Sequence, residues 1–331
     1  MAAYGSSPSE CAYVQRLLRM LASAGVALMF VVIVSSAYLR LTQAGLSCAD
    51  WPSCYGRAQA DIAATGVQSA RLLHRVAASA VGIVLLGALL IGVTQRPRLK
   101  AQTLIAAVAL IIALLLAALG SRFSASGGGI PTPGVMLANL GGGFALLALL
   151  WWLRLTTSAP PSVRNEPPVW VKLVAALALL ASIAQIALGG LVSANFAALA
   201  CPSFPGCGAD WPQAALIEAL HPSRSAASGT GAGMAHGSAL AALHWAHRVG
   251  ALIVFAHGAA IVPALMRYGG NGRRIGSILA LLLIVELVLG SAAVLANFPL
   301  ALAVAHNAAA AMLLVALMTA NRALNANGAT P

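Results

Sequence analysis

Two histidine–arginine pairs lie near the start of long apolar segments of the chain. His74 lies in residues 72–76, LLHRV, and His247 lies in residues 242–250, ALHWAHRVG. A third histidine, His306, occupies a comparable place in an apolar segment near the C-terminus. Ionisable side chains within membrane segments are costly and usually have a function. The pattern therefore indicates polar chemistry inside an otherwise apolar protein.

The chemistry that suits these residues is haem ligation. Each of the three histidines lies one or two turns into its segment, so at a rise of about 1.5 Å per residue they share a similar depth. Two imidazoles that face each other in an apolar helical bundle can ligate haem iron from both sides, and we predict this for His247 and His306. Arg75 and Arg248 suit haem propionates, because guanidinium pairs with carboxylate through two parallel bonds. Interfacial anchoring is the alternative for both arginines.

Other polar residues leave alternatives open. His244 lies three residues before His247 on the same helical face and is its rival as a ligand. His236 and His257 are better interpreted as structural residues. A zinc site fits less well, since structural zinc takes four ligands with cysteine among them. Glu286, deep in another apolar segment, is either a proton carrier or a hydrogen-bonded structural group.

Composition identifies the elements that must position these residues. The chain is 60% hydrophobic and only 8% charged, and its mean hydropathy is +0.89. These values are typical of an all-α polytopic membrane protein. A transmembrane helix needs roughly 20 mostly apolar residues. Eight segments qualify, at about 17–39, 72–94, 101–120, 134–153, 169–194, 240–266, 275–296 and 299–320.

The positive charges predict the orientation of these helices. The net charge of +12 is spread between the segments as a topology signal, so no nucleic-acid partner is expected. Twelve basic residues fall on the side of both termini: Arg16, Arg19, Arg96, Arg98, Lys100, Arg154, Arg164, Lys172, Arg267, Arg273, Arg274 and Arg322. Seven fall on the other side: Arg40, Arg57, Arg71, Arg75, Arg122, Arg224 and Arg248. We predict a multi-pass protein of a bacterial-type inner (plasma) membrane with both termini cytoplasmic.

This orientation places two long connections, at about 40–71 and 195–239, on the outer side. Four of the five cysteines fall there as the pairs Cys48 with Cys54 and Cys201 with Cys207. An oxidising compartment favours disulfides for such pairs, and redox-active exchange remains open. Cys11 is left as a free thiol on the cytoplasmic side.

The chain contains an internal repeat. The runs LSCADWPSCY and ACPSFPGCGADWP each precede a segment with His-Arg-Val, and Leu-Gly-Ser at 119–121 recurs at 289–291. Asn139 then falls opposite His306. Because four helices are an even number, both copies cross the membrane in the same sense, which predicts two parallel four-helix-bundle repeats. The predicted divisions are a tail at 1–16, halves at 17–155 and 169–321, a linker at 156–168 and a tail at 322–331.

These motifs together resemble the haem A synthase family. The resemblance covers nearly the whole chain, through CADWPSCY, the second cysteine pair, HWAHRVG and LAVAHNAAAA. It implies conversion of haem O to haem A by two successive oxidations of the C8 methyl group, for cytochrome c oxidase biogenesis. It also implies that the C-terminal half holds haem b between His247 and His306. The N-terminal half would receive the substrate haem O at His74 and at a histidine two helices later.

The chain departs from the family pattern in the N-terminal half. Arg71 stands where the family has a glutamate, three residues before His74, and Asn139 stands where it has the second histidine. A haem held by His74 alone would keep an open face, which favours oxygen chemistry. The opposite interpretation is that this half has lost its catalytic role.

We therefore predict a haem A synthase-like oxidoreductase. The alternative is a non-catalytic haem-b-binding assembly factor or b-type electron carrier on the same scaffold. A transporter fits the helical repeat but lacks the broken helices expected at a central site. The expected partners are haem O and its synthase, a membrane electron acceptor, cytochrome oxidase assembly factors and a second copy of the chain.

Overall fold

Helices are the regular secondary structure of the part of the chain that the structure describes. This computed structural model describes residues 8–43, 65–95, 99–125, 132–158, 166–207, 217, 237–267 and 270–326. Within these ranges no strand occurs, and eight helices are long and apolar enough to cross a membrane. The prediction of an all-α polytopic membrane protein is confirmed.

The helices run somewhat longer than the predicted spans. The elements are α1 (Pro8–Gln43), α2 (Thr65–Thr94), α3 (Lys100–Ala125), α4 (Pro133–Thr156), α5 (Val169–Ala194), the short 3₁₀ helix η1 (Ala198–Ala200), α7 (Gly237–Arg267), α8 (Gly272–Leu295) and α9 (Leu300–Asn325). α1 begins well before the predicted start at 17, so part of the predicted N-terminal tail is helical. Val14 helps to explain the extension, because it is buried in a cluster with residues of α2, α3 and α4. The acidic Glu10 in the first turn also stabilises the helix, because its negative charge lies at the positive end of the helix dipole.

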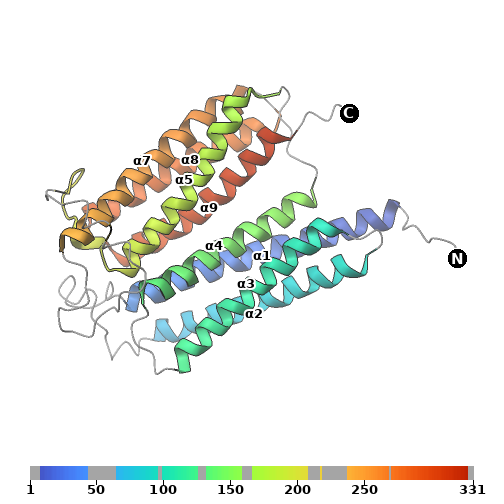
Figure 1. Cartoon of the computed structure of the whole chain (residues 1–331), viewed down its shortest axis with the longest axis horizontal. Coiled ribbons are helices and arrows are strands. Elements are labelled where there is room, and N and C mark those ends of the chain that lie inside the picture. The colour runs from blue at the N-terminus through green and yellow to red at the C-terminus, as the bar shows by residue number, and fades with distance from the viewer. Residues whose placement is uncertain are drawn as a thin grey trace.

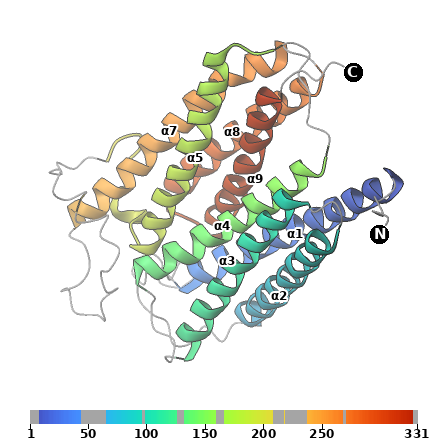
Figure 2. The same cartoon turned by 45° about the vertical axis from the view of Figure 1, so that its right-hand side comes forward.

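The eight long helices form two bundles that lie side by side (Figures 1 and 2). In the first bundle, α1 packs against α2 and α4, and α3 packs against α2 and α4. In the second, α5 and α8 each pack against both α7 and α9. The start of α1 and the end of α9 lie at one end of the molecule, as an even number of crossings requires (Figure 1).

The two bundles meet through α1, α4, α5 and α9. Hydrogen bonds between described side chains cross this interface: Arg40 Nε donates to Ser193 Oγ at 2.9 Å, and Trp151 Nε1 donates to Thr319 Oγ1 at 3.0 Å. Gly190 allows close approach of α5 to α4, since a Cβ there would lie 2.9 Å from Leu137 Cδ1. The interface is therefore packed and hydrogen-bonded.

Candidate functional site

The second bundle brings the side chains of His247 of α7 and His306 of α9 close together, with their rings almost perpendicular. Their ring centroids are 6.3 Å apart, and the ring planes are inclined at 89°. An imidazole nitrogen binds a first-row metal ion at about 2 Å, which places two rings on opposite sides of one ion about 6 Å apart. The observed separation therefore fits a single metal ion, such as haem iron, between the two rings.

His247 is held by two residues of α5 that are one turn apart. The amide nitrogen of Gln185 lies 3.0 Å from His247 Nδ1 and also donates to the backbone carbonyl of His247 at 2.8 Å. A Cβ on Gly189 would lie 2.9 Å from Cε1 of the ring. Gly250 in turn leaves room for the Gln185 amide, whose oxygen a Cβ would meet. The ring is therefore contacted on its Nδ1 side. Metal binding through Nε2 puts the proton on Nδ1, so the Gln185 amide must then turn its oxygen, in place of its nitrogen, toward the ring.

His306 has a comparable neighbour on α8, but its Nδ1 makes an ion-pair contact there instead of a hydrogen bond. Glu286 Oε1 lies 3.3 Å from His306 Nδ1, and both side chains are largely buried, at 18% and 29% exposure. Gly290, one turn after Glu286, faces the ring: a Cβ there would lie 3.3 Å from Cε1. We call Gln185 with Gly189, and Glu286 with Gly290, the two histidine seats. The sequence analysis noted Glu286 but did not assign it to a histidine, and it missed Gln185.

The first bundle has a different arrangement. His74 Nδ1 lies 3.3 Å from both Ser35 Oγ and the Val32 carbonyl oxygen of α1. Arg71, Arg75 and Asn139 are exposed side chains. The first bundle therefore gives His74 a polar partner on α1, while the two positions that depart from the family pattern face outward from the packed helices.

The first bundle also lacks the acidic residue of the second. If Gly120 corresponds to Gly290, as the Leu-Gly-Ser runs indicate, the position of Glu286 is occupied by Leu116. Leu116 packs against α4, since a Cβ on Gly142 would meet its side chain at 2.7 Å. At this position the first bundle has an apolar side chain packed between helices, whereas the second bundle has a carboxyl group beside a histidine.

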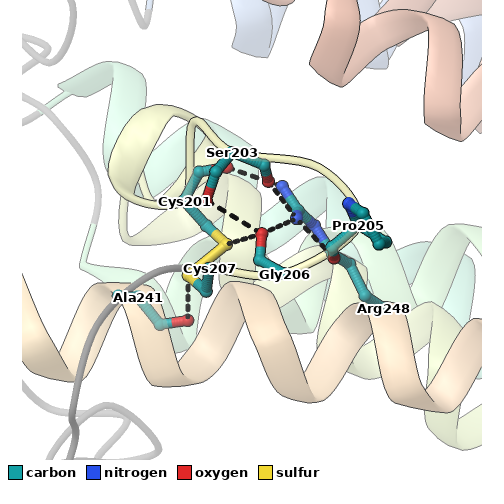
Figure 3. Close-up of a disulfide and its surroundings, with 7 residues drawn as sticks. All are labelled: Cys201, Ser203, Pro205, Gly206, Cys207, Ala241 and Arg248. Atoms are coloured by element: carbon teal, nitrogen blue, oxygen red, sulfur yellow. Dashed lines mark hydrogen bonds between the residues drawn. A yellow bond between two sulfur atoms is a disulfide. The ribbon is translucent and has the colours of Figure 1, made fainter.

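Arg248 is engaged by the loop at residues 201–207. Its Nη2 donates to the Cys201 carbonyl at 2.6 Å. Its Nη1 donates to the carbonyls of Ser203 at 2.6 Å, Gly206 at 3.0 Å and Pro205 at 3.2 Å (Figure 3). A disulfide joins Cys201 to Cys207 within this loop. The propionate contact predicted for Arg248 stays a prediction, because the structure directs these N–H groups to the loop.

The remaining candidates lie elsewhere. His244 is only 3% exposed and packs edge-on against Phe298, with the ring centroids 5.6 Å apart. Of His244 and His247, it is therefore His247 whose ring lies next to that of His306. His257 Nδ1 contacts the Ile253 carbonyl of its own helix at 2.8 Å, which fits a structural residue. Among the candidate cysteines and histidines, Cys48, Cys54 and His236 lie outside the described part of the chain.

Comparison with known proteins places this geometry in a family. Residues 19–318 match the COX15-CtaA family, described as cytochrome oxidase assembly protein. The chain is also 32% identical over 317 residues to a heme A synthase of Shewanella oneidensis, across 88% of this chain and 91% of that protein. The match covers both bundles and the residues of both histidine seats. The chain therefore belongs to the haem A synthase family of cytochrome oxidase assembly proteins.

Proposed function

We propose that this protein is a membrane oxidoreductase that converts haem O to haem A. The C8 methyl group would become a formyl group in two successive oxidations, with the oxygen taken from water and the electrons passed to a membrane acceptor. The observation that carries this proposal is the pair of seated histidines, His247 and His306, whose separation suits one iron atom. Family membership supplies the substrate class.

The residues of the second bundle fit haem b. His247 and His306 would hold the iron from both sides, and the two seats keep each Nε2 free for it. A haem held by these two histidines would supply one-electron transfer. The zinc alternative is not supported by this geometry, since Cys201 and Cys207 are joined in a disulfide and Cys11, the third described cysteine, is exposed near the start of α1.

The first bundle would receive haem O. His74 is its candidate ligand, oriented by Ser35 and the Val32 carbonyl. With Asn139 in place of the second histidine, His74 would hold the substrate from one side only. Arg75 is exposed one residue after His74 and would bind a propionate of the incoming haem.

One observation favours a second candidate function. The first bundle has Leu116 and Asn139 where the second has Glu286 and His306, so only the second bundle holds two seated histidines. A protein with a single complete site could act as a haem-b-binding assembly factor or electron carrier. Such a protein would share the partners expected of a synthase, including the haem O synthase and oxidase assembly factors.

We also propose the placement of the chain in a bacterial-type inner membrane. Both termini would be cytoplasmic, and the loop at 201–207 would lie on the outer side. The two bundles would correspond to the repeat halves at 17–155 and 169–321. The basic residues that flank the helices support this orientation, since positive charge is retained on the cytoplasmic side.

A pigment analysis tests the proposed function. The chain is expressed with a source of haem O in a host that lacks its own haem A synthase, and the extracted haems are separated. We expect haem A or its hydroxylated precursor, and we expect none from the His247→Ala/His306→Ala variant. Bound, reducible haem b without either product would reject the synthase and support the assembly factor or electron carrier.

A further inference from the structure

The two histidine seats share their geometry but differ in charge. Each seat has a polar side chain at Nδ1 and a glycine one turn later at Cε1. The polar group is a neutral amide at His247 and a carboxyl group at His306. We propose that Glu286 and Gln185 are positioning residues that make the two ligands unequal, with His306 the stronger electron donor. This inference rests on the proposed haem site.

The two ligands are unequal because a carboxylate and an amide differ in the hydrogen bonds that they can make with imidazole Nδ1. An imidazole that binds a metal through Nε2 carries its proton on Nδ1, and that N–H needs an acceptor. A carboxylate only accepts hydrogen bonds, whereas an amide offers both a donor and an acceptor. Glu286 therefore selects the ligating tautomer of His306. A carboxylate behind a ligating histidine also raises the basicity of that ligand.

The surroundings of Glu286 support a dedicated role. A carboxyl group within a membrane helix is expensive and normally has a function. Glu286 is 18% exposed, and its Oε2 is buried without a hydrogen-bond partner among the described residues. In that part of the chain its one ion-pair contact is His306 rather than an arginine or lysine. The charge of Glu286 would therefore act mainly on His306 and on the iron that it binds.

The first bundle provides an internal comparison. His74 is oriented by the neutral groups of Ser35 and Val32, and Leu116 occupies the position that corresponds to Glu286. An acidic seat is thus a property of the second bundle rather than of the repeated scaffold. A nearby negative charge stabilises ferric over ferrous haem, so the acidic seat would lower the reduction potential of the second site.

The test is the midpoint potential of the haem-b-loaded protein, purified in detergent and titrated spectroscopically. Glu286→Gln should shift the potential upward, and Gln185→Glu should shift it downward. The exchange variant Gln185→Glu/Glu286→Gln should return toward the wild-type value. Ser182→Ala is the matched control, because Ser182 is a buried polar residue of α5 outside both seats, and it should leave the potential unchanged.

The outcomes separate this inference from the proposed function. If Glu286→Gln keeps a low-spin haem spectrum and the wild-type potential, the unequal seats are refuted and the haem site stands. If Glu286→Gln binds no haem, the test rests on the midpoint potential of Gln185→Glu. A lowered potential supports the inference, and an unchanged or raised potential refutes it. If the wild-type protein binds no haem, or if His247→Ala and His306→Ala leave the spectrum unchanged, both proposals fail.

Discussion

At the scale of single residues, the site depends on glycines as much as on histidines. Gly189 and Gly290 are the residues whose missing side chains leave space for the rings of His247 and His306. A glycine within a helix normally costs up to about 1 kcal/mol relative to alanine. Two glycines placed against two facing histidines therefore indicate that ring position is maintained at some expense of helix stability.

We expect Gly189→Ala to weaken haem binding by about tenfold or more, in line with other changes to groups that orient metal ligands. The added Cβ would lie 2.9 Å from Cε1 of His247, so the ring must move away from its place opposite His306. The measurement is the haem content of purified protein at a series of haem concentrations. Gly120→Ala is the control, because a Cβ there meets nothing within 4 Å. Equal haem binding by the two variants would contradict the prediction.

We expect Arg71→Glu/Asn139→His to raise haem A production. The glutamate would supply a proton acceptor near His74, and the histidine would supply a second ligand for the substrate haem. Proton transfer by a positioned side chain commonly contributes about 100-fold to a rate. Haem A yield per bound haem b is compared with wild type in a host without its own synthase. The control is Arg71→Gln/Asn139→His, which removes the same positive charge but supplies no carboxylate. No increase would favour the assembly factor or electron carrier.

At the scale of elements, the loop at 201–207 and α7 form one unit. Arg248 donates to four carbonyl oxygens of this loop, and Cys207 Sγ lies 3.7 Å from the Ala241 carbonyl oxygen of α7 (Figure 3). Because Arg248 directly follows His247, the same helical turn supports both the loop and the proposed ligand. The loop is thereby fixed at the end of the second bundle nearest the histidines.

We expect Arg248→Ala to release this loop. Hydrogen bonds to a charged group contribute about 1.5–3 kcal/mol each, so their loss should make Cys201 and Cys207 react at least about tenfold faster with a mild reductant and a thiol reagent. The rate is followed by mass spectrometry of the labelled peptide. Arg75→Ala, an exposed arginine of α2, serves as the control. An unchanged rate would show that the loop is held by other contacts.

At the scale of the whole molecule, the chain provides its own topology probe. Cys11 is a free, exposed cysteine near the start of α1, and the proposed orientation puts it in the cytoplasm. A membrane-impermeant maleimide should therefore label Cys11 only after the cells are permeabilised, and Cys11→Ser should abolish that signal. Labelling of Cys11 in intact spheroplasts would show that the topology is the reverse of the one proposed.

The sequence by itself determined the number and approximate place of the membrane helices. Spanning a bilayer requires about 20 consecutive apolar residues, and that requirement can be read from composition alone. It also identified His247 and His306 as the notable intramembrane histidines, because few polar residues occur in these segments. The division into repeats and the ligand roles stay predictions that the experiments above address.

Only the tertiary structure decided which polar groups meet. Neither the pairing of Gln185 with His247, nor that of Glu286 with His306, nor the engagement of Arg248 by the loop could be derived from the chain. The physical reason is that these helices are apolar on every side, so no hydrophobic stripe in the sequence shows which face turns inward. Helix rotation and depth follow from packing, and packing brings together residues that lie 20 to 62 positions apart.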